Sequence, residues 1–259
     1  MSTSDLHIEL SDVHKSFGPK TVLDGINLKV RRGHSMVVIG GSGTGKSVML
    51  KCIIGLMTPT SGTIKLDGKE VGNLPQHDRD KLMSKFGMLF QGGALFDSLP
   101  IWENVAFRLI QGSGMDRDQA REISQEKLRQ VGLGADVMDL NPNELSGGMQ
   151  KRVGLARAIA ADPEIIFFDE PTTGLDPIMA DVINDLIVDC VKNLGATAIS
   201  ITHDMASARK IGDDAALIHK GKIIWSGDMA NIDNSGNDYV EQFIHGRAEG
   251  PIKMDILKA

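Results

Sequence analysis

The chain has 259 residues, of which 41% are hydrophobic and 24% are charged, so it can bury one large core or two small ones. Its formal net charge is -6, which disfavours a protein that binds nucleic acid through a basic surface. The polar start MSTSDLHIEL lacks the pattern of a secretory signal. The sequence also contains no apolar run of about 18 residues, the length that would predict a membrane span. Any action at a membrane is therefore expected to go through a partner. Cys52 and Cys190 lie in apolar helical patterns and are expected to be reduced core residues.

The first part of the chain has the pattern of an antiparallel sheet. Apolar and polar residues alternate over residues 6–10 and again over residues 26–30, which predicts two half-buried strands. Residues 62–66 and 69–71 flank Asp67-Gly68, a pair typical of a primed hairpin turn. These strands predict an N-terminal antiparallel β subdomain.

A glycine-rich stretch follows the apolar run at residues 35–39, which predicts a buried strand, and precedes an apolar helix expected over residues 47–56. It matches the pattern G-x-x-x-x-G-K-[ST] at every fixed position. Its glycines let successive backbone N–H groups point at one anion, and the helix adds the positive end of its dipole. A plain glycine turn is the alternative, against which both flanks argue. The predicted phosphate-binding residues are Gly40, Gly41, Ser42, Gly43, Thr44, Gly45, Lys46 and Ser47, with Lys46 also catalytic and the Ser47 hydroxyl a ligand of Mg²⁺.

The middle of the chain changes from strand to helix after Gln91. Residues 86–90 predict a buried strand, whereas residues 92–145 carry helical patterns without a convincing strand. We therefore expect a helical subdomain, residues 92–160, inserted into an α/β body. Gln91 stands at the strand end, where its amide can reach a metal ion or a water molecule; the alternative is an ordinary solvated glutamine.

Ser146-Gly147-Gly148 directly precedes a predicted helix, with Ser146 as a natural N-cap. The exposed N–H groups there make a second anion site in the chain. Because the glycine-rich loop already serves one side of a triphosphate, this second site is most simply assigned to a nucleotide held by another copy. The alternative is an N-cap with a permissive turn.

Acidic and imidazole groups follow two further strands. Asp169 and Glu170 come directly after the apolar run at residues 165–168, and His203 follows the strand expected over residues 196–202. Asp169 is predicted to hold Mg²⁺ and Glu170 to deprotonate an attacking water. His203 would contact the γ-phosphate or that water. The alternatives are a solvated acidic pair and a structural histidine.

The last third of the chain alternates strands with helices. Asp176-Pro177 is expected to cap and open a helix that Gly195 ends, and residues 215–219 and 222–225 predict a hairpin. Such alternation predicts a largely parallel sheet with ligands at the carboxyl ends of its strands. The residues of this helix expected to face inward are Ile178, Val182, Leu186, Cys190 and Leu194.

The order of these motifs resembles that of ABC transporter ATPase subunits over about residues 6–227. The resemblance implies an α/β P-loop NTPase: a RecA-like parallel-sheet core, the antiparallel β subdomain and the inserted helical subdomain, with the ATPase domain at residues 6–245 and a tail at residues 246–259. It also implies a head-to-tail homodimer that holds ATP and Mg²⁺ between the glycine-rich loop and Ser146-Gly147-Gly148 of the other copy. Asp176 belongs to the family's Gly-Leu-Asp motif at this site. Phe17 resembles the aromatic that stacks on adenine, with Phe in place of the usual Tyr, and Met149 stands where Gln is common.

Two stretches are similar to the Mla/Mce-type lipid transporter ATPases: residues 92–107, GGALFDSLPIWENVAF, and residues 242–251, QFIHGRAEGP. This resemblance implies an ATPase that powers phospholipid transport between the inner and outer membranes and lies on the cytoplasmic face of the inner membrane. The implied partners are an integral MlaE-like permease, a periplasmic MCE-domain (MlaD-like) protein and a small STAS-domain (MlaB-like) subunit, with no nucleic acid. The alternatives are the ATPase of another importer, such as one for amino acids, and an ABC ATPase that acts on DNA or ribosomes.

Overall fold

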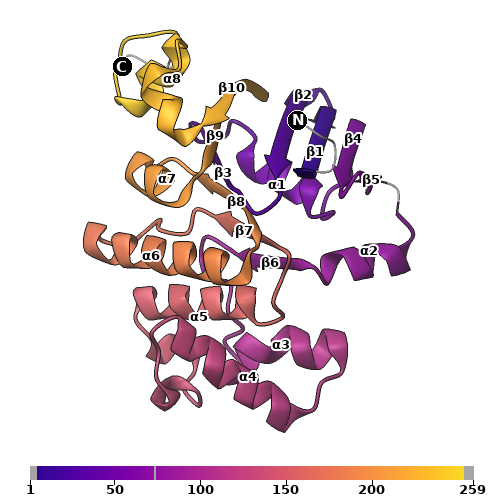
Figure 1. Cartoon of the computed structure of the whole chain (residues 1–259), viewed down its shortest axis with the longest axis vertical. Helices are drawn as coiled ribbons and strands as arrows, with labels where there is room; N and C mark the ends of the chain where they lie inside the picture. Colours follow the sequence, from indigo (N-terminus) through magenta and orange to yellow (C-terminus); the bar gives the residue numbers. More distant parts are fainter. Residues whose placement is uncertain (1–4, 73, 254–259) are drawn as a thin grey trace.

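The computed structural model of the chain describes residues 5–72 and 74–253 (Figure 1). Residues 1–4, for which no secretory signal was predicted, lie outside the described residues. Residues 254–259, the last six of the predicted tail, also lie outside them. Figure 1 shows two sheets beside each other in the upper part of the molecule, with α3, α4 and α5 gathered at the end opposite α8. The predicted combination of a β subdomain, an α/β core and a helical segment is confirmed.

The N-terminal sheet has four strands in the order β2-β1-β4-β5, and its pairs are antiparallel as predicted. Asp67 and Gly68 both have positive φ, 51° and 73°, which is the backbone of the predicted primed turn. The strands are β1 Leu6–Phe17, β2 Lys20–Arg31, β4 Ser61–Leu66 and β5 Lys69–Glu70.

The central sheet has six strands in the order β10-β9-β3-β8-β7-β6. All its pairs are parallel except the predicted hairpin of β9 and β10. All residues of β3 and β8 are buried, as expected for inner strands of a parallel sheet that is covered on both faces. The strands are β3 Ser35–Ile39, β6 Phe86–Leu89, β7 Ile165–Asp169, β8 Thr197–Thr202, β9 Asp214–His219 and β10 Lys222–Asp228.

Two hydrophobic cores form on the two faces of this sheet because alternate side chains of each strand point to opposite sides. Within β7, Ile165 and Phe167 join the core shared with the N-terminal sheet and α1 Lys46–Ile53. Ile166 and Phe168 join the other core, which the remaining large helices cover. The glycine-rich loop therefore lies between a strand and a helix that are both anchored in packed core.

The helical segment between β6 and β7 contains three helices that pack on one another: α3 Ile101–Ser113, α4 Arg117–Gln130 and α5 Gly147–Ile159. Asp116 caps α4 as predicted, since its carboxylate accepts hydrogen bonds from the N–H groups of Asp118 at 2.9 Å and Gln119 at 3.4 Å. Residue-level domain boundaries at 92, 160 and 245 stay predictions.

One prediction about α6 Pro177–Leu194 is wrong. Ile178 is 79% exposed and Val182 is 41% exposed, although both were expected to face inward. Residues spaced by four advance about 40° around a helix at each step, so a strict i+4 stripe cannot stay on one face for 18 residues. The buried residues of this helix are instead Ile183, Asn184, Ile187, Cys190 and Val191. Cys190 and Cys52 are both buried and free, as predicted.

Shorter elements complete the chain and were not predicted. They are the helices α2 Gln76–Met83, α7 Met205–Ile211 and α8 Asp238–Ile244, and the 3-10 turns η2 Ala135–Val137, η3 Pro142–Glu144 and η4 Met229–Asn234. Among the described residues, no helix combines the length and the hydrophobicity that a bilayer crossing requires.

Candidate nucleotide site

The glycine-rich loop joins β3 to α1, and its backbone admits only glycine at two positions. Gly40 has a φ of 154°, and a Cβ atom there would lie 2.4 Å from the carbonyl oxygen of Ile218. Gly45 has a φ of 108°, and a Cβ atom there would lie 2.8 Å from Cδ2 of Leu23. Because the neighbouring strands close on both sides, the loop keeps its curled backbone and its concave face.

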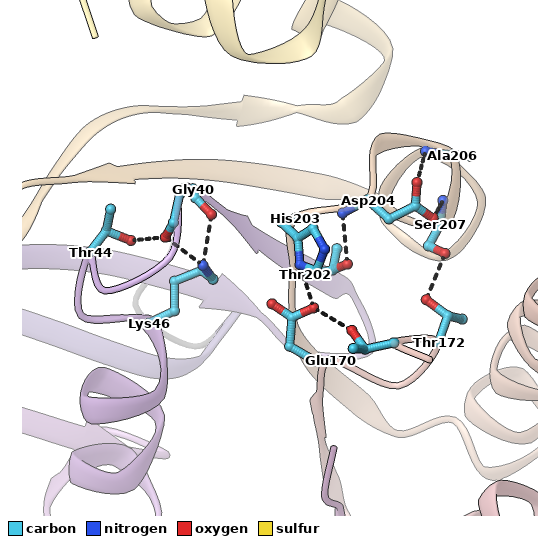
Figure 2. Close-up of polar contacts among 12 residues, drawn as sticks. Gly40, Thr44, Lys46, Glu170, Thr172, Thr202, His203, Asp204, Ala206 and Ser207 are labelled. Carbon is cyan, nitrogen blue, oxygen red and sulfur yellow. Dashed lines mark hydrogen bonds and ion pairs between the residues drawn. The ribbon is translucent and has the colours of Figure 1, made fainter. Parts of the chain in front are cut away.

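Lys46 extends back across this loop (Figure 2). Its Nζ donates hydrogen bonds to the carbonyl oxygens of Gly40 at 2.7 Å and Gly41 at 2.9 Å. The side chain is almost completely buried, which lowers the pKa of its ammonium group, while the nearby carboxylates of Glu170 and Asp169 raise it. The ammonium group is thus held at the mouth of the loop by weak neutral acceptors, for which phosphate oxygens would be stronger replacements.

Glu170 follows β7 and is fixed by its backbone and its side chain. Its φ is 49°, and its N–H donates to the carbonyl oxygen of Ile201 in the neighbouring strand at 2.9 Å. Its Oε2 accepts a hydrogen bond from the hydroxyl of Thr173 at 2.9 Å. The same oxygen lies 2.8 Å from Nδ1 of His203 (Figure 2). An ionised carboxylate only accepts, so Nδ1 carries the hydrogen and Nε2 is the second ring nitrogen available for a ligand. The pair has the arrangement of a base and the group that orients it.

Asp169 lies at the last position of β7 and has a different environment. Burial raises the pKa of its carboxyl group and Glu170 adds to this effect, whereas Lys51, Lys46 and Lys151 act in the opposite direction. None of the described residues donates a hydrogen bond to its carboxylate. A half-buried carboxylate with free oxygen atoms fits a hard cation such as Mg²⁺. Ser47 and Gln91 line the same cavity, and their hydroxyl and amide oxygens could join Asp169 in holding such an ion.

This cavity has a volume of about 650 Å³ and contains most of the predicted nucleotide-binding residues. It joins the loop to the ends of β6, β7 and β8, because the parallel strands place their carboxyl ends at one edge. The predicted residues in its lining are Gly41, Ser42, Gly43, Thr44, Gly45, Lys46, Ser47, Gln91, Asp169, Glu170 and His203.

The remaining predicted residues do not line this cavity. Gly40 lies beneath the loop, and Phe17 is 46% exposed with the ammonium of Lys15 5.2 Å above its ring. The other predicted residues, Ser146, Gly147, Gly148 and Asp176, lie at the starts of α5 and α6.

Both helix starts are well formed. Ser146 caps α5, since its hydroxyl accepts a hydrogen bond from the N–H of Met149 at 3.3 Å, and Ser146 and Gly147 are exposed. Asp176 caps α6 and accepts from two backbone N–H groups at 3.0 Å. A Cβ atom on Gly148 would lie 3.0 Å from the side chain of Met179 in α6, so the two helix starts are packed together. One chain therefore carries a complete loop and a separate, outward-facing helix N-terminus.

Four further residues of the site were not predicted: Val22, Val48 and Phe243, which line the cavity, and Thr173, which contacts Glu170 from outside this lining. Thr173 bonds the carboxylate of Glu170, and only its position three residues after Glu170 could have suggested this contact. Val22 comes from β2 and Phe243 from α8, and both line the cavity only because distant segments fold beside the loop. No local pattern in the sequence indicates these two contacts.

The sequence matches the profile of the ABC transporter family over residues 23–173. It is 38% identical over 247 residues to the intermembrane phospholipid transport system ATP-binding protein MlaF of Haemophilus influenzae, which covers 95% of this chain and 93% of that protein. It is 41% identical over 266 residues to the chloroplastic protein TRIGALACTOSYLDIACYLGLYCEROL 3 of Arabidopsis thaliana, which covers 96% of this chain and 76% of that protein. A probable ribonucleotide transport ATP-binding protein, mkl, of Mycobacterium leprae is 39% identical over 95% of this chain and 71% of its own length.

Solved structures show the same fold. A bacterial ABC transporter cassette determined as a dimer superposes with a TM-score of 0.79 and 32% identity, covering 86% of this chain and 98% of that one. A dimeric ATP-binding cassette in a post-hydrolysis state with ADP and phosphate superposes with a TM-score of 0.78 and 31% identity over the same shares of the two chains.

Proposed function

This chain belongs to the ABC transporter family of ATPases, and we propose that it powers the transport of phospholipid between the inner and outer membranes of a Gram-negative envelope. The observation that carries the proposal is the similarity to a phospholipid transport ATPase, which extends over 95% of the chain and includes the surface after Gln91. The name of the plant relative points to glycerolipid as well.

ATP hydrolysis uses the cavity between the loop and the strand ends. We assign the phosphates to the loop amides and Lys46, and Mg²⁺ to Ser47, Gln91 and Asp169. When bound, Mg²⁺ neutralises charge that develops on the phosphate oxygens. Glu170 accepts the proton of the attacking water.

His203 and Thr173 keep the carboxylate of Glu170 in place through their contacts with Oε2, which leaves Oε1 to face the water. In the same assignment, Nε2 of His203 contacts the γ-phosphate, and the exposed ring of Phe17 stacks on adenine.

A second copy completes each site in this proposal. Ser146, Gly147 and Gly148 would contact the γ-phosphate of a nucleotide on the opposite loop, with Asp176 beside them. The exposure of Ile178 and Val182, at 79% and 41%, supports such an interface, because these apolar side chains project from α6 directly after Asp176. The solved cassettes with the same fold are dimers.

The surface that follows Gln91 supports a membrane partner. Phe96 and Phe107 form an aromatic pair with ring centroids 4.5 Å apart, and Phe96 is 42% exposed. Phe90, 37% exposed, precedes Gln91. We assign this aromatic surface to an MlaE-like permease, which would hold the ATPase on the cytoplasmic face of the inner membrane.

In this proposal the complex also contains an MlaD-like MCE-domain protein and an MlaB-like STAS-domain subunit. Neither subunit is assigned to a particular surface of this chain.

Affinity purification from the host membranes tests the cargo and the partners together. We expect an integral permease and an MCE-domain protein to copurify, with phospholipid in the organic extract. Phe96→Asp should release the ATPase into the soluble fraction, whereas Leu56→Asp, which changes another exposed apolar residue, should leave it bound. Recovery of a periplasmic amino-acid-binding protein without lipid would contradict the proposed cargo, and equal membrane binding of both variants would contradict the docking surface.

A further inference from the structure

The loop that carries Gln91 is held along its backbone by α5. Arg157 donates hydrogen bonds to the carbonyl oxygens of Gly93 at 2.6 Å and Ala94 at 2.7 Å. A Cβ atom on Gly154 would lie 3.4 Å from Cα of Gly93, so helix and loop are in direct contact. The segment from Gln91 to Ala94, here called the Gln91 loop, is therefore packed and bonded to one helix.

Lys151 adds the contact nearest to the site. Its Nζ donates a hydrogen bond to the carbonyl oxygen of Gln91, and only 6% of the residue is exposed. Burial lowers the pKa of its ammonium group, while the charges of Asp169 and Glu170 raise it. The mechanism described above does not use this buried cation.

The same helix begins at Ser146. Only four residues lie between Ser146 and Lys151. The turn between them is rigid because Nε2 of Gln150 donates to the carbonyl oxygens of Pro142 at 2.9 Å and Leu145 at 3.3 Å. One end of α5 thus presents the N–H groups assigned to the partner's nucleotide, and the next turn holds the backbone of Gln91 in its own site.

We propose that Lys151 is a positioning residue that ties Gln91 to α5, so that contact between Ser146 and the nucleotide on a second copy fixes Gln91 in the site of the first. The inference rests on the proposed composite site and adds a physical link between the two sites of the dimer. A nucleotide that engages the start of α5 moves Lys151 and the Gln91 loop with it, because the helix and this loop behave as one body. The dimer consequently hydrolyses ATP cooperatively.

The charge of Lys151 is part of this role. A charge-assisted hydrogen bond to a carbonyl group is stronger than a neutral one, and the methylene stem fills the space between α5 and the loop. Lys151→Met keeps most of that volume but removes the donor, and Lys151→Arg keeps a cation with donors. A purely structural role would depend on the volume, whereas the positioning role depends on the donor.

Steady-state ATP hydrolysis by the full chain tests the proposal. Lys151→Met should lower kcat about tenfold, the size expected for the loss of one charge-assisted hydrogen bond, while the KM for ATP changes less than about threefold. Its Hill coefficient for ATP should fall to 1. Lys151→Arg should recover both kcat and cooperativity.

A double-mutant cycle with Gln91→Ala shows through which group Lys151 acts. If Lys151 acts through Gln91, Lys151→Met should add no more than about twofold to the loss that Gln91→Ala causes by itself. Full multiplication of the two losses would overturn the inference.

Lys127→Met is the matched control, since Lys127 is also buried, at 7% exposure, and bonds Asp162 away from the cavity. It should lower the thermal midpoint while kcat and the Hill coefficient remain those of the wild type. Lys151→Leu, which also lacks a donor, provides a second variant should Lys151→Met not fold.

ATP-driven dimerisation of Glu170→Gln, measured by light scattering, distinguishes a failure of the composite site from a failure of the role proposed for Lys151. If this variant stays monomeric with ATP, the composite site itself is wrong. If it dimerises but Lys151→Met retains wild-type kcat and cooperativity, the composite site stands and the role of Lys151 is refuted.

Discussion

Replacement of Thr173 by alanine tests whether the carboxylate of Glu170 must be held in one orientation. The hydroxyl of Thr173 donates to Oε2 of Glu170 at 2.9 Å, and His203 contacts the same oxygen at 2.8 Å. Thr173→Ala removes one of these contacts and leaves the other. Because the side chain of Glu170 is only 14% exposed, water cannot freely replace the lost donor.

The size of the effect follows from the contacts that remain. A hydrogen bond to a charged group contributes about 1.5–3 kcal/mol, and about 1.4 kcal/mol corresponds to a tenfold change in rate. Since His203 still orients Oε2 in the variant, we expect the lower end of this range, a decrease in kcat of about tenfold. ATP affinity should stay close to wild type, because Thr173 does not line the loop that holds the phosphates.

Steady-state ATPase assays together with fluorescent-nucleotide binding measure these two quantities separately. Thr173→Ser keeps the hydroxyl and serves as the matched control, with an expected kcat within about twofold of wild type. Wild-type turnover by Thr173→Ala would refute the claim that two donors are needed. Equal losses in the alanine and serine variants would show that the methyl group matters, and not the hydrogen bond.

Three further predictions concern the composite site and stability. Glu170→Gln should bind ATP without hydrolysing it and accumulate as a dimer in size-exclusion chromatography with light scattering; a monomer with bound ATP would contradict this. Ser146→Arg and Lys46→Ala should each be inactive alone, and their mixture should recover partial ATPase activity, since one site of the heterodimer then keeps an intact loop and an intact helix start; no recovery would argue against sharing between copies. Burial lowers the pKa of His7 in the folded state below the ordinary 6.5, so the unfolded state binds more protons below that pH and the free energy of unfolding should fall as the pH decreases from 6.5, by at most about 1.4 kcal/mol per pH unit. In chemical denaturation at pH 7 and pH 5, His7→Gln should show a smaller difference than wild type, and an unchanged difference would rule His7 out as the source.

The cavity could be anticipated from the sequence because its main residues lie at the ends of neighbouring parallel strands. Ile39 of β3 pairs with Thr202 of β8, and Ile201 of β8 pairs with Asp169 of β7. The loop, the two carboxylates and His203 each come at the end of a predicted strand or within a few residues of it. Prediction of the strands therefore suffices to place these groups at one edge of the sheet.

The contacts that the sequence did not indicate depend on helix orientation. The exposed side of α6 at Ile178 and Val182 differs from the prediction because an apolar pattern of one helix permits two neighbouring faces, and the packing of α5 and α7 selects between them. The sequence also did not distinguish Lys151 from the other cationic residues of its helix. Its proximity to Gln91, sixty residues earlier, results from the docking of α5 against β6.

The electrostatics of the cavity explain why a second copy would be required. Within one chain, Lys46 and Lys151 oppose the two carboxylates Asp169 and Glu170, so these four side chains are already close to balance. A triphosphate with one Mg²⁺ brings a net negative charge into this balanced site. The amides of the glycine-rich loop offset part of this charge, and in the proposed composite site the exposed start of α5 of a second copy adds further backbone N–H groups. In this proposal, nucleotide charge favours closure of two chains, its loss as phosphate leaves favours their separation, and a membrane partner uses the resulting change in shape.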